Sequence, residues 1–249
     1  MKLPLFTTIV ITFAFIWFYM KNSTRKMKEE DEKFWEKELK ANSVRKQPLT
    51  DLDYIKIPFE ELALETLSES LSDSDSEESP ANPVIAECTQ KILGLKRKRI
   101  VNLNGISNTD LKLKYGVSNL TVLSEYDENY TILVSALADL AEELYKLSLS
   151  EDELMRRYPE VDLSAESSIE TDEAKRLEYR KAAVRILECA VKCGSDVKRS
   201  YALLSDIYVE DKNYDRIEEL IEIASASGSS YKDGIVAELK KRSIFTPNY

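Results

Sequence analysis

The sequence predicts an all-α protein with one N-terminal membrane helix, an acidic linker and a C-terminal domain of helical hairpins. Three observations support this fold class. The chain begins with an uncharged apolar run; beyond residue 84, apolar residues recur at spacings of three and four; and only six glycines occur in 249 residues. Alternating apolar and polar residues are rare, so a β-sheet has little to build on. The C-terminal portion, about 150 residues, suits one ordinary domain.

The first twenty residues have the length and composition of a membrane helix. Leu3 to Met20 carry no charge, and at 1.5 Å per residue they span roughly 27 Å. Trp17 and Tyr19 stand near the end of this run, where aromatic rings prefer the headgroup level, and Lys21 follows. A cleaved signal peptide is the alternative, but no small-x-small site precedes Lys21. We therefore expect residues 1–20 to remain as a single-pass transmembrane anchor.

Basic residues and cysteines together indicate the orientation of this anchor. Four basic residues follow the apolar run, namely Lys21, Arg25, Lys26 and Lys28. Only Lys2 and the amino group precede it, so the positive-inside rule places the rest of the chain in the cytoplasm. The three cysteines are an odd number and too few for a disulfide framework, which favours reduced thiols. The expected location is the cell membrane, with the C-terminal domain on the cytoplasmic side.

Residues 21–83 connect the anchor to the domain. Residues 21–47 are rich in Lys and Glu, which predicts a charged juxtamembrane helix that is either a solvated helix end or a self-associating stalk. Residues 48–83 form the predicted linker, extended at first and acidic and serine-rich later. Within it, residues 68–83 are expected to be disordered, because they offer too little apolar surface to offset the entropy of ordering.

Residues 84–249 are predicted to form a helical domain. Its expected helices are one that starts at Asn82-Pro83 and reaches Leu95, 108–115 closed by Gly116, 120–126, 130–147 capped by Asn129, 171–193 closed by Gly194, one starting at 195 or 196, 214–226 and 230–242. An insertion at 148–168 contains a capping box from Ser150 to Glu153. The short turns between the last helices predict antiparallel hairpins.

The spacing in these hairpins resembles the tetratricopeptide repeat, a 34-residue helix-turn-helix unit. In the last hairpin the matching positions are Tyr201, Leu204, Ser205, Tyr208, Tyr214 and Ala224, whereas Ile217 replaces a small residue. The preceding hairpin matches at Leu137, Leu140, Ala141, Ala183, Leu187 and Ala190. Ala190 precedes Ala224 by one repeat length, and the insertion departs from the pattern. The resemblance implies a tetratricopeptide-like domain that binds protein.

A second resemblance is to a group of bacterial proteins with a single membrane anchor. It is carried by residues 100–116 and also by Phe34-Trp35 and residues 51–55. It covers most of the chain apart from the serine-rich tract and the insertion. This resemblance implies a bacterial, singly anchored protein and no particular activity.

Composition excludes several classes of function. The net charge of −10 and the pI of about 4.9 disfavour nucleic acid as a partner. Histidine is absent, which removes the usual general base and the common nucleophile pairs. Cys88, Cys189 and Cys193 are better explained as small buried apolar residues than as ligands, because two cysteines four apart make half a structural zinc site. We expect no enzyme activity, no metal, no cofactor and no small-molecule ligand.

The remaining hypothesis is a membrane-anchored adaptor or scaffold that binds a protein partner. The first helices of stacked hairpins form a concave surface, and on it the candidate contacts are Ser135, Glu142, Tyr145, Arg199, Asp206 and Glu210. A basic cluster, Lys96, Arg97, Lys98 and Arg99, is a candidate site for anionic lipid, with plain solvated charge as the alternative. The competing functional class is an enzyme that uses carboxylates or a thiol on a helical scaffold.

Overall fold

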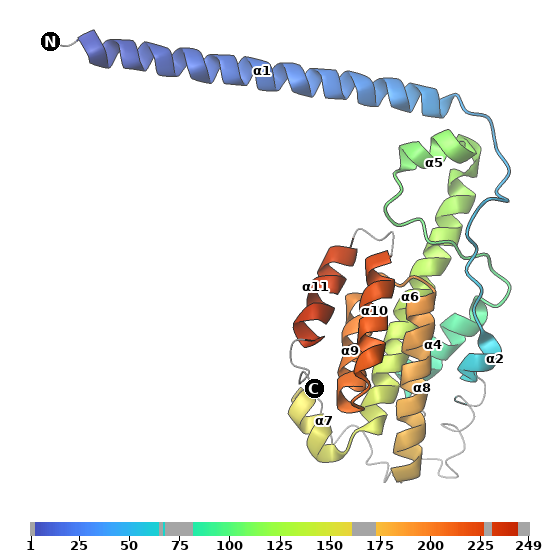
Figure 1. Ribbon diagram of the computed structural model, residues 1–249. Helices are drawn as coiled ribbons and strands as arrows, with labels where there is room; N and C mark the ends of the chain where they lie inside the picture. The colour runs from blue at the N-terminus through green and yellow to red at the C-terminus, as the bar shows by residue number, and fades with distance from the viewer. Residues whose placement is uncertain (1–2, 65–66, 68–81, 161–172, 227–230, 244–249) are drawn as a thin grey trace. The chain divides into compact units, whose positions relative to one another are not determined.

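The computed structural model describes residues 3–64, 67, 82–160, 173–226 and 231–243, with side chains from Val10 onward (Figure 1). The described chain divides into two compact units. Unit 1 comprises residues up to 51 and 106–122, and unit 2 comprises residues 52–105 and 123 onward. All regular structure in the described residues is helical, apart from one isolated antiparallel bridge between Tyr54 and Val101. The predicted all-α class is therefore confirmed.

Unit 1 is built from a long helix, α1 (Leu3–Asn42), a short helix, α5 (Asn108–Tyr115), and a 3-10 turn, η1 (Val117–Asn119). The side chain of Ser107 caps α5 by accepting from the Asp110 backbone N–H. Glu38 of α1 accepts hydrogen bonds from Thr109, at 2.8 Å, and from Lys112. These bonds fix α5 against the C-terminal end of α1, where Ala41 is fully buried.

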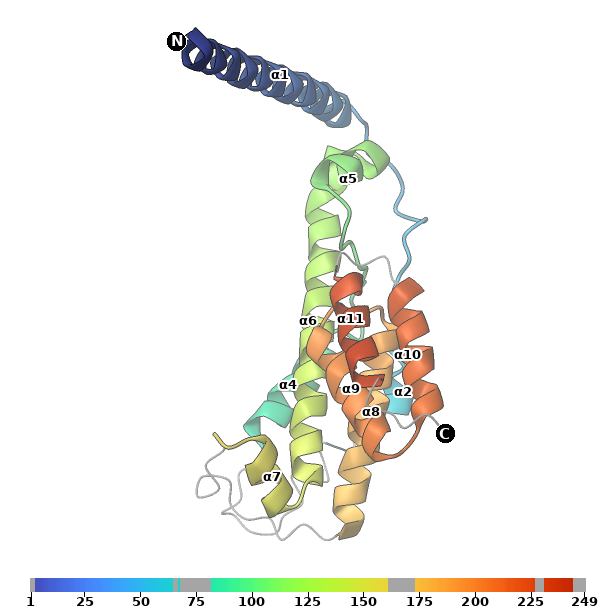
Figure 2. The same ribbon diagram turned by 60° about the vertical axis from the view of Figure 1, so that its left-hand side comes forward.

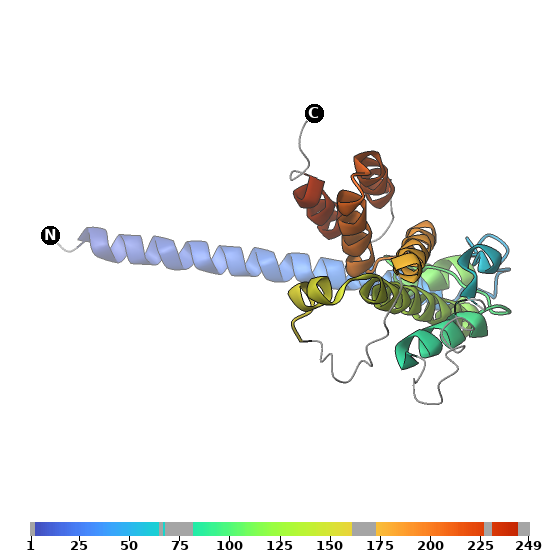
Figure 3. The same ribbon diagram turned by 90° about the horizontal axis from the view of Figure 1, so that it is seen from below.

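Unit 2 contains the larger group of helices. They are α2 (Phe59–Leu62), α4 (Pro83–Gly94), residues 123–148 of α6 (Leu120–Ser148), α7 (Glu151–Arg157), α8 (Glu173–Lys192), α9 (Lys198–Glu210), α10 (Tyr214–Ala226) and α11 (Lys232–Ser243). Helices α8, α9, α10 and α11 lie side by side, seen lengthwise in Figures 1 and 2 and closer to end-on in Figure 3. Helix α9 contacts α8, α10 and α11.

The core of unit 2 lies where α6 meets the later helices. Leu133, Leu137, Leu140, Ala141 and Leu144 of α6 are fully buried, as their spacing predicted. They share one cluster with the apolar stripes of α4, α8, α9 and α10. Burial of this stripe supplies the main driving force for packing, since each large apolar side chain contributes about 1.5–3 kcal/mol when removed from water.

Hydrogen bonds hold the loop that contains residues 100–104 against the turn between α8 and α9. Gly194, in the left-handed conformation at φ 71°, ends α8. Its carbonyl oxygen accepts hydrogen bonds from the hydroxyl of Tyr130 at 2.8 Å and from Asn102 Nδ2 at 3.3 Å. Asn104 Nδ2 donates to Asp196 at 2.9 Å. The asparagines of this loop are therefore explained by the fold, because each one satisfies a polar group beyond the end of α8.

Most predicted helices in the domain are confirmed, but one boundary is wrong. The segments predicted as 120–126 and 130–147 form one continuous helix, α6. Asn129 is not a cap; it is buried inside α6, and its Nδ2 donates to the Arg99 carbonyl at 3.0 Å. An asparagine favours a cap only when its side chain bonds to a nearby backbone N–H, and here a loop carbonyl is the partner instead.

The domain boundaries also differ from the prediction. Residues 108–122, predicted to belong to the C-terminal domain, are assigned to unit 1 with α1. The predicted linker contains α2, and Leu62 and Leu64 are buried in the core of unit 2. Apolar side chains in this stretch supply enough buried surface to order it. The acidic segment 68–81 and the last part of the predicted insertion, 161–168, lie outside the described residues, whereas the capping box at Ser150 is confirmed.

The predicted anchor, residues 1–20, forms the first part of α1 from Leu3 onward, and the helix continues without a break through the predicted charged segment to Asn42. The side chains of residues 3–9 lie outside the described residues. Within the described part of the chain, no helix combines the length and the apolarity needed to cross a membrane.

Two alanines mark close helix contacts one repeat length apart. Ala190 of α8 and Ala224 of α10 are 0% and 1% exposed. We expect Ala190→Leu and Ala224→Leu each to lower the free energy of unfolding by about 1–3 kcal/mol, because added methyl groups overpack a filled contact. Urea denaturation followed by circular dichroism would measure this loss. Ala237→Leu on the exposed face of α11 is the matched control and should change stability by less than about 0.5 kcal/mol. Equal midpoints for all three variants would contradict the expected close contacts.

Candidate functional site

The solvent-facing side of α8 carries two adjoining cavities. The larger has a volume of about 970 Å³ and the smaller about 690 Å³. Arg185 and Glu188 of α8 line both of them. Helix α8 contacts α2, so the stretch that leads into and out of α2 forms the opposite wall. The exposed face of α8 thus borders both cavities.

The larger cavity, called here the α8 groove, is apolar with a charged border. Its apolar lining is Ala63, Leu67, Leu177, Tyr179, Ala182 and Val184. Its charged lining is Glu178, Arg180, Lys181, Arg185, Glu188 and Asp211. Leu177 is 51% exposed although it is a large apolar residue on a helix. An exposed leucine within an apolar concavity is typical of a docking surface.

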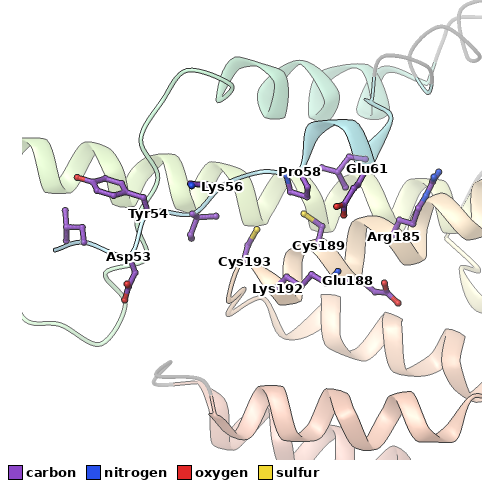
Figure 4. A pocket seen from close by; sticks show the side chains of 13 residues that line it. Asp53, Tyr54, Lys56, Pro58, Glu61, Arg185, Glu188, Cys189, Lys192 and Cys193 are labelled. Atoms are coloured by element: carbon purple, nitrogen blue, oxygen red, sulfur yellow. The ribbon is translucent and has the colours of Figure 1, made fainter. Parts of the chain in front are cut away.

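The smaller cavity, called here the thiol cavity, contains two cysteines. Cys189 lies in the last turn of α8, and Cys193 follows the end of that helix. Figure 4 shows both sulfur atoms on the side of α8 that faces Pro58 and Glu61. Lys56, Arg185 and Lys192 also line the cavity. The spacing of four residues brings the two thiols together because residues i and i+4 share one face of a helix.

The two thiols of this cavity have different acidities. A hydrogen bond from Cys189 lowers the pKa of Cys193, because it favours the thiolate form of the acceptor. The same hydrogen bond, followed by burial, raises the pKa of Cys189. Cys88 lies elsewhere in the core, and burial raises its pKa to about 11. Cys193 is therefore the thiol that loses its proton first.

Alkylation at increasing pH should reveal this order. We expect iodoacetamide to modify Cys193 of the native protein before Cys88 and Cys189, because only the thiolate is nucleophilic. The rate at Cys193 should reach its plateau at a lower pH than the rate at Cys88, where the thiolate forms near pH 11. Mass spectrometry of peptides from timed samples would measure both rates. Faster labelling of Cys88 would contradict the assignment, and unfolding in urea should remove the difference.

Of the residues predicted to bind a partner, Tyr145 and Glu210 lie in an internal ion network. Tyr145 is fully buried, and its hydroxyl donates to both carboxylate oxygens of Glu210 at 3.1 and 3.2 Å. Glu210 also accepts from Arg157 of α7 and, at 2.9 Å, from Arg180 of α8. The two guanidinium groups lie 5.6 and 5.8 Å from the Tyr145 ring centroid. This network joins α6, α7, α8 and α9.

Three other predicted residues, Glu142, Arg199 and Asp206, are brought together around a small pocket of about 190 Å³ between α6 and α9. Arg199 donates to Glu142 at 3.2 Å and to Asp139, and Asp206 accepts from Arg242 of α11. The remaining candidate, Ser135, is half-buried on α6. Each charged member of the predicted set thus has a partner within the chain. Its role in binding protein stays a prediction.

The predicted lipid site, Lys96 to Arg99, lies after α4. Arg99 lies 5.5 Å from the Tyr54 ring centroid and donates to the hydroxyl of Tyr126 at 3.4 Å. Lys96 lies 5.8 Å from the Phe59 ring centroid. Arg97 and Lys98 are exposed. Two of the four cations therefore contact the extended segment and α2, and lipid binding by the cluster stays a prediction.

The sequence patterns did not identify the α8 groove or the thiol cavity. One wall of each comes from residues 52–67, which were predicted to be linker, so no helical periodicity in α8 alone indicates a cavity. The available signal was Leu177, which stands between Arg176 and Glu178 at the charged start of α8.

Among the described residues, no three or more Asp, Glu or Cys side chains are grouped to hold a metal ion. Comparison with known proteins found no matching family model, no matching curated protein and no matching solved structure.

Proposed function

We propose that this protein is a membrane-anchored adaptor whose α8 groove binds a segment of a partner protein. The observation that carries the proposal is the groove itself, a concavity of about 970 Å³ with an apolar lining and a charged border. Apolar concavities with a few charged groups at the border are typical of sites that bind amphipathic peptides. The proposal assigns no catalytic step to the domain.

The first part of α1 supports the membrane anchor. From Val10 to Met20 the large apolar side chains are 50–75% exposed on every side of the helix. A helix that is apolar all round is expected to be covered by lipid or by protein. Trp17 and Lys21, whose Nζ lies 5.0 Å from the indole ring centroid, suit the border between hydrocarbon and headgroups. We place the remainder of the chain on the cytoplasmic side, following the basic residues after Met20.

Charges beside the groove suggest the chemistry of the partner. Lys181 and Arg185 are exposed and stand four residues apart along α8 at its border. Two of the three acidic groups there are paired within the chain, since Glu188 accepts from Arg216 at 2.6 Å and Asp211 accepts from Arg180 at 2.8 Å. The third, Glu178, is exposed. The best-fitting partner is an amphipathic peptide with apolar anchors and acidic flanks.

We also propose that the hairpins α6–α8 and α9–α10 are tetratricopeptide-like repeats. Burial of Ala190 and Ala224, one repeat length apart, supports this assignment, as does burial of Tyr201, Leu204 and Tyr208 on α9. Ile217 is buried where the repeat usually has a small residue. Helical repeats commonly serve as binding surfaces, which agrees with the adaptor function.

Peptide binding would test the groove. Full-length protein in nanodiscs is titrated into fluorescent amphipathic peptides that carry either Glu or Lys around the same apolar anchors, and anisotropy is measured. We expect the acidic peptide to bind more tightly. Leu177→Glu and Arg185→Glu should each weaken its binding about tenfold, a change of about 1.4 kcal/mol. Met155→Glu is the matched control, because Met155, like Leu177, is a large apolar side chain exposed on a helix, with 57% exposure on α7.

Crosslinking in cells measures occupancy of the α8 groove independently of the peptide titration. A photo-crosslinking amino acid at position 177 should capture one defined protein, and the same probe at Met155 should not. Val184→Glu should abolish that crosslink if the partner lies in the groove. Peptides that bind without regard to charge, together with crosslinks that survive Val184→Glu, would refute the proposed site.

A further inference from the structure

The thiol cavity holds a pair of cysteines that the proposed adaptor function does not use. Cys189 and Cys193 are 4% and 8% exposed, yet both line a cavity of about 690 Å³. The backbone N–H of Cys193 donates to the Cys189 carbonyl at 2.9 Å, so the two residues are one helical turn apart. Cys88, which is equally buried, lines none of the cavities described. If the two thiols only filled the core, there would be no physical reason for both of them to line a cavity large enough to admit a ligand.

We propose that Cys189 and Cys193 bind one soft, monovalent, thiophilic metal ion, of which Cu(I) is the physiological example. Soft thiolate ligands select such ions over Mg²⁺ or Ca²⁺. Two thiolates are half of a structural zinc site, whereas two sulfur ligands in a linear arrangement are sufficient for a d¹⁰ monovalent ion. The spacing of four residues places both ligands on one side of α8 (Figure 4).

The binding step is balanced by the loss of two protons. Each thiol gives up its proton to solvent, two metal–sulfur bonds form, and no oxidation state changes. The resulting complex carries one negative charge, because two thiolates surround a monovalent cation. Three cations that line the same cavity, Lys56, Arg185 and Lys192, favour the anionic complex, and three carboxylates there, Asp53, Glu61 and Glu188, balance them in number. A cation bound to one thiolate favours deprotonation of the other thiol.

Competition with a chromogenic Cu(I) chelator would test this site. Full-length protein in detergent is titrated without oxygen, and the transfer of Cu(I) from bicinchoninate is followed by absorbance. We expect one Cu(I) per chain. Cys189→Ser and Cys193→Ser should each weaken binding about 100-fold or more, since each removes one of two ligands. Cys88→Ser is the matched control, and its affinity should equal that of the unmodified protein.

Two measurements on the unmodified protein keep the test decisive where a serine variant fails to fold. X-ray absorption should show two sulfur neighbours around copper, and affinity should rise with pH because protons are released. Retention of Cu(I) by the Cys189→Ser/Cys193→Ser double variant, or copper bound without sulfur neighbours, would overturn the proposal. So would an equal loss of affinity in Cys88→Ser. The peptide-binding test of the α8 groove is independent of each of these outcomes.

Discussion

Tyr145→Ala should lower the free energy of unfolding of unit 2 by about 3–5 kcal/mol, the range for removing a large buried aromatic side chain. Tyr145 is fully buried, so truncation leaves a cavity in the core. The same change removes the ring on which Arg157 and Arg180 stack and the hydroxyl that donates to Glu210. Pulse proteolysis in urea would measure the loss as a shift of the unfolding midpoint.

Tyr145→Phe separates the hydroxyl from the ring. Burial, and then the charge of Glu210, raise the pKa of Tyr145 well above its usual value, so the hydroxyl is protonated and donates at neutral pH. Removing it should cost about 1 kcal/mol, because Glu210 keeps its two arginine partners. Met155→Ala, at an exposed position on α7, serves as the control with an expected change below about 0.5 kcal/mol. If Tyr145→Phe matched Tyr145→Ala, the hydrogen bond rather than packing would dominate.

Helix patterns predicted the fold class and the positions of most helices because local signals determine them. Asn82 caps α4 by accepting from the N–H groups of Val84 and Ile85, and Gly194 ends α8 with a positive φ. The exception, Asn129, carries a strong local signal for a cap, but its side chain reaches the carbonyl of Arg99, thirty residues earlier in the chain. A contact at that sequence separation is not visible in a local pattern.

The candidate site was harder to predict because its walls come from distant segments. Sequence spacing correctly places Cys189 and Cys193 on one face of α8, but it does not show that residues 52–62 enclose a cavity beside them. Likewise, the charged residues expected to contact a partner include Arg199 and Glu210, which the structure pairs with groups on other helices. Whether a surface charge meets a partner inside the chain depends on tertiary packing, which a single helix pattern does not contain.

Gly116→Ala should destabilise unit 1 by at least about 2 kcal/mol, because two separate costs add. Gly116 has φ 82° and ψ 151°, a region that is nearly exclusive to glycine and costs other residues about 1–3 kcal/mol. A β-carbon there would also lie 2.6 Å from the carbonyl oxygen of Arg45. That neighbour is backbone, held nearby by the hydrogen bond from the Gln47 N–H to the Tyr115 carbonyl at 3.0 Å. Rotation of a side chain would not relieve this contact, so the backbone has to move to accommodate the β-carbon.

The effect of Gly116→Ala should be confined to contacts of unit 1. Displacing residues 45–47 would break the bond from Asn119 Nδ2 to the Gln47 carbonyl, which measures 2.7 Å. Hydrogen exchange should then speed up at the amides of α5 and of residues 43–47, while the amides of α8 and α9 keep their protection. Gly94→Ala, where an added β-carbon has no neighbour within 4 Å, is the matched control and should leave every rate unchanged. Unchanged exchange in α5 of Gly116→Ala would show that the turn accommodates a side chain, contrary to the close approach of Arg45.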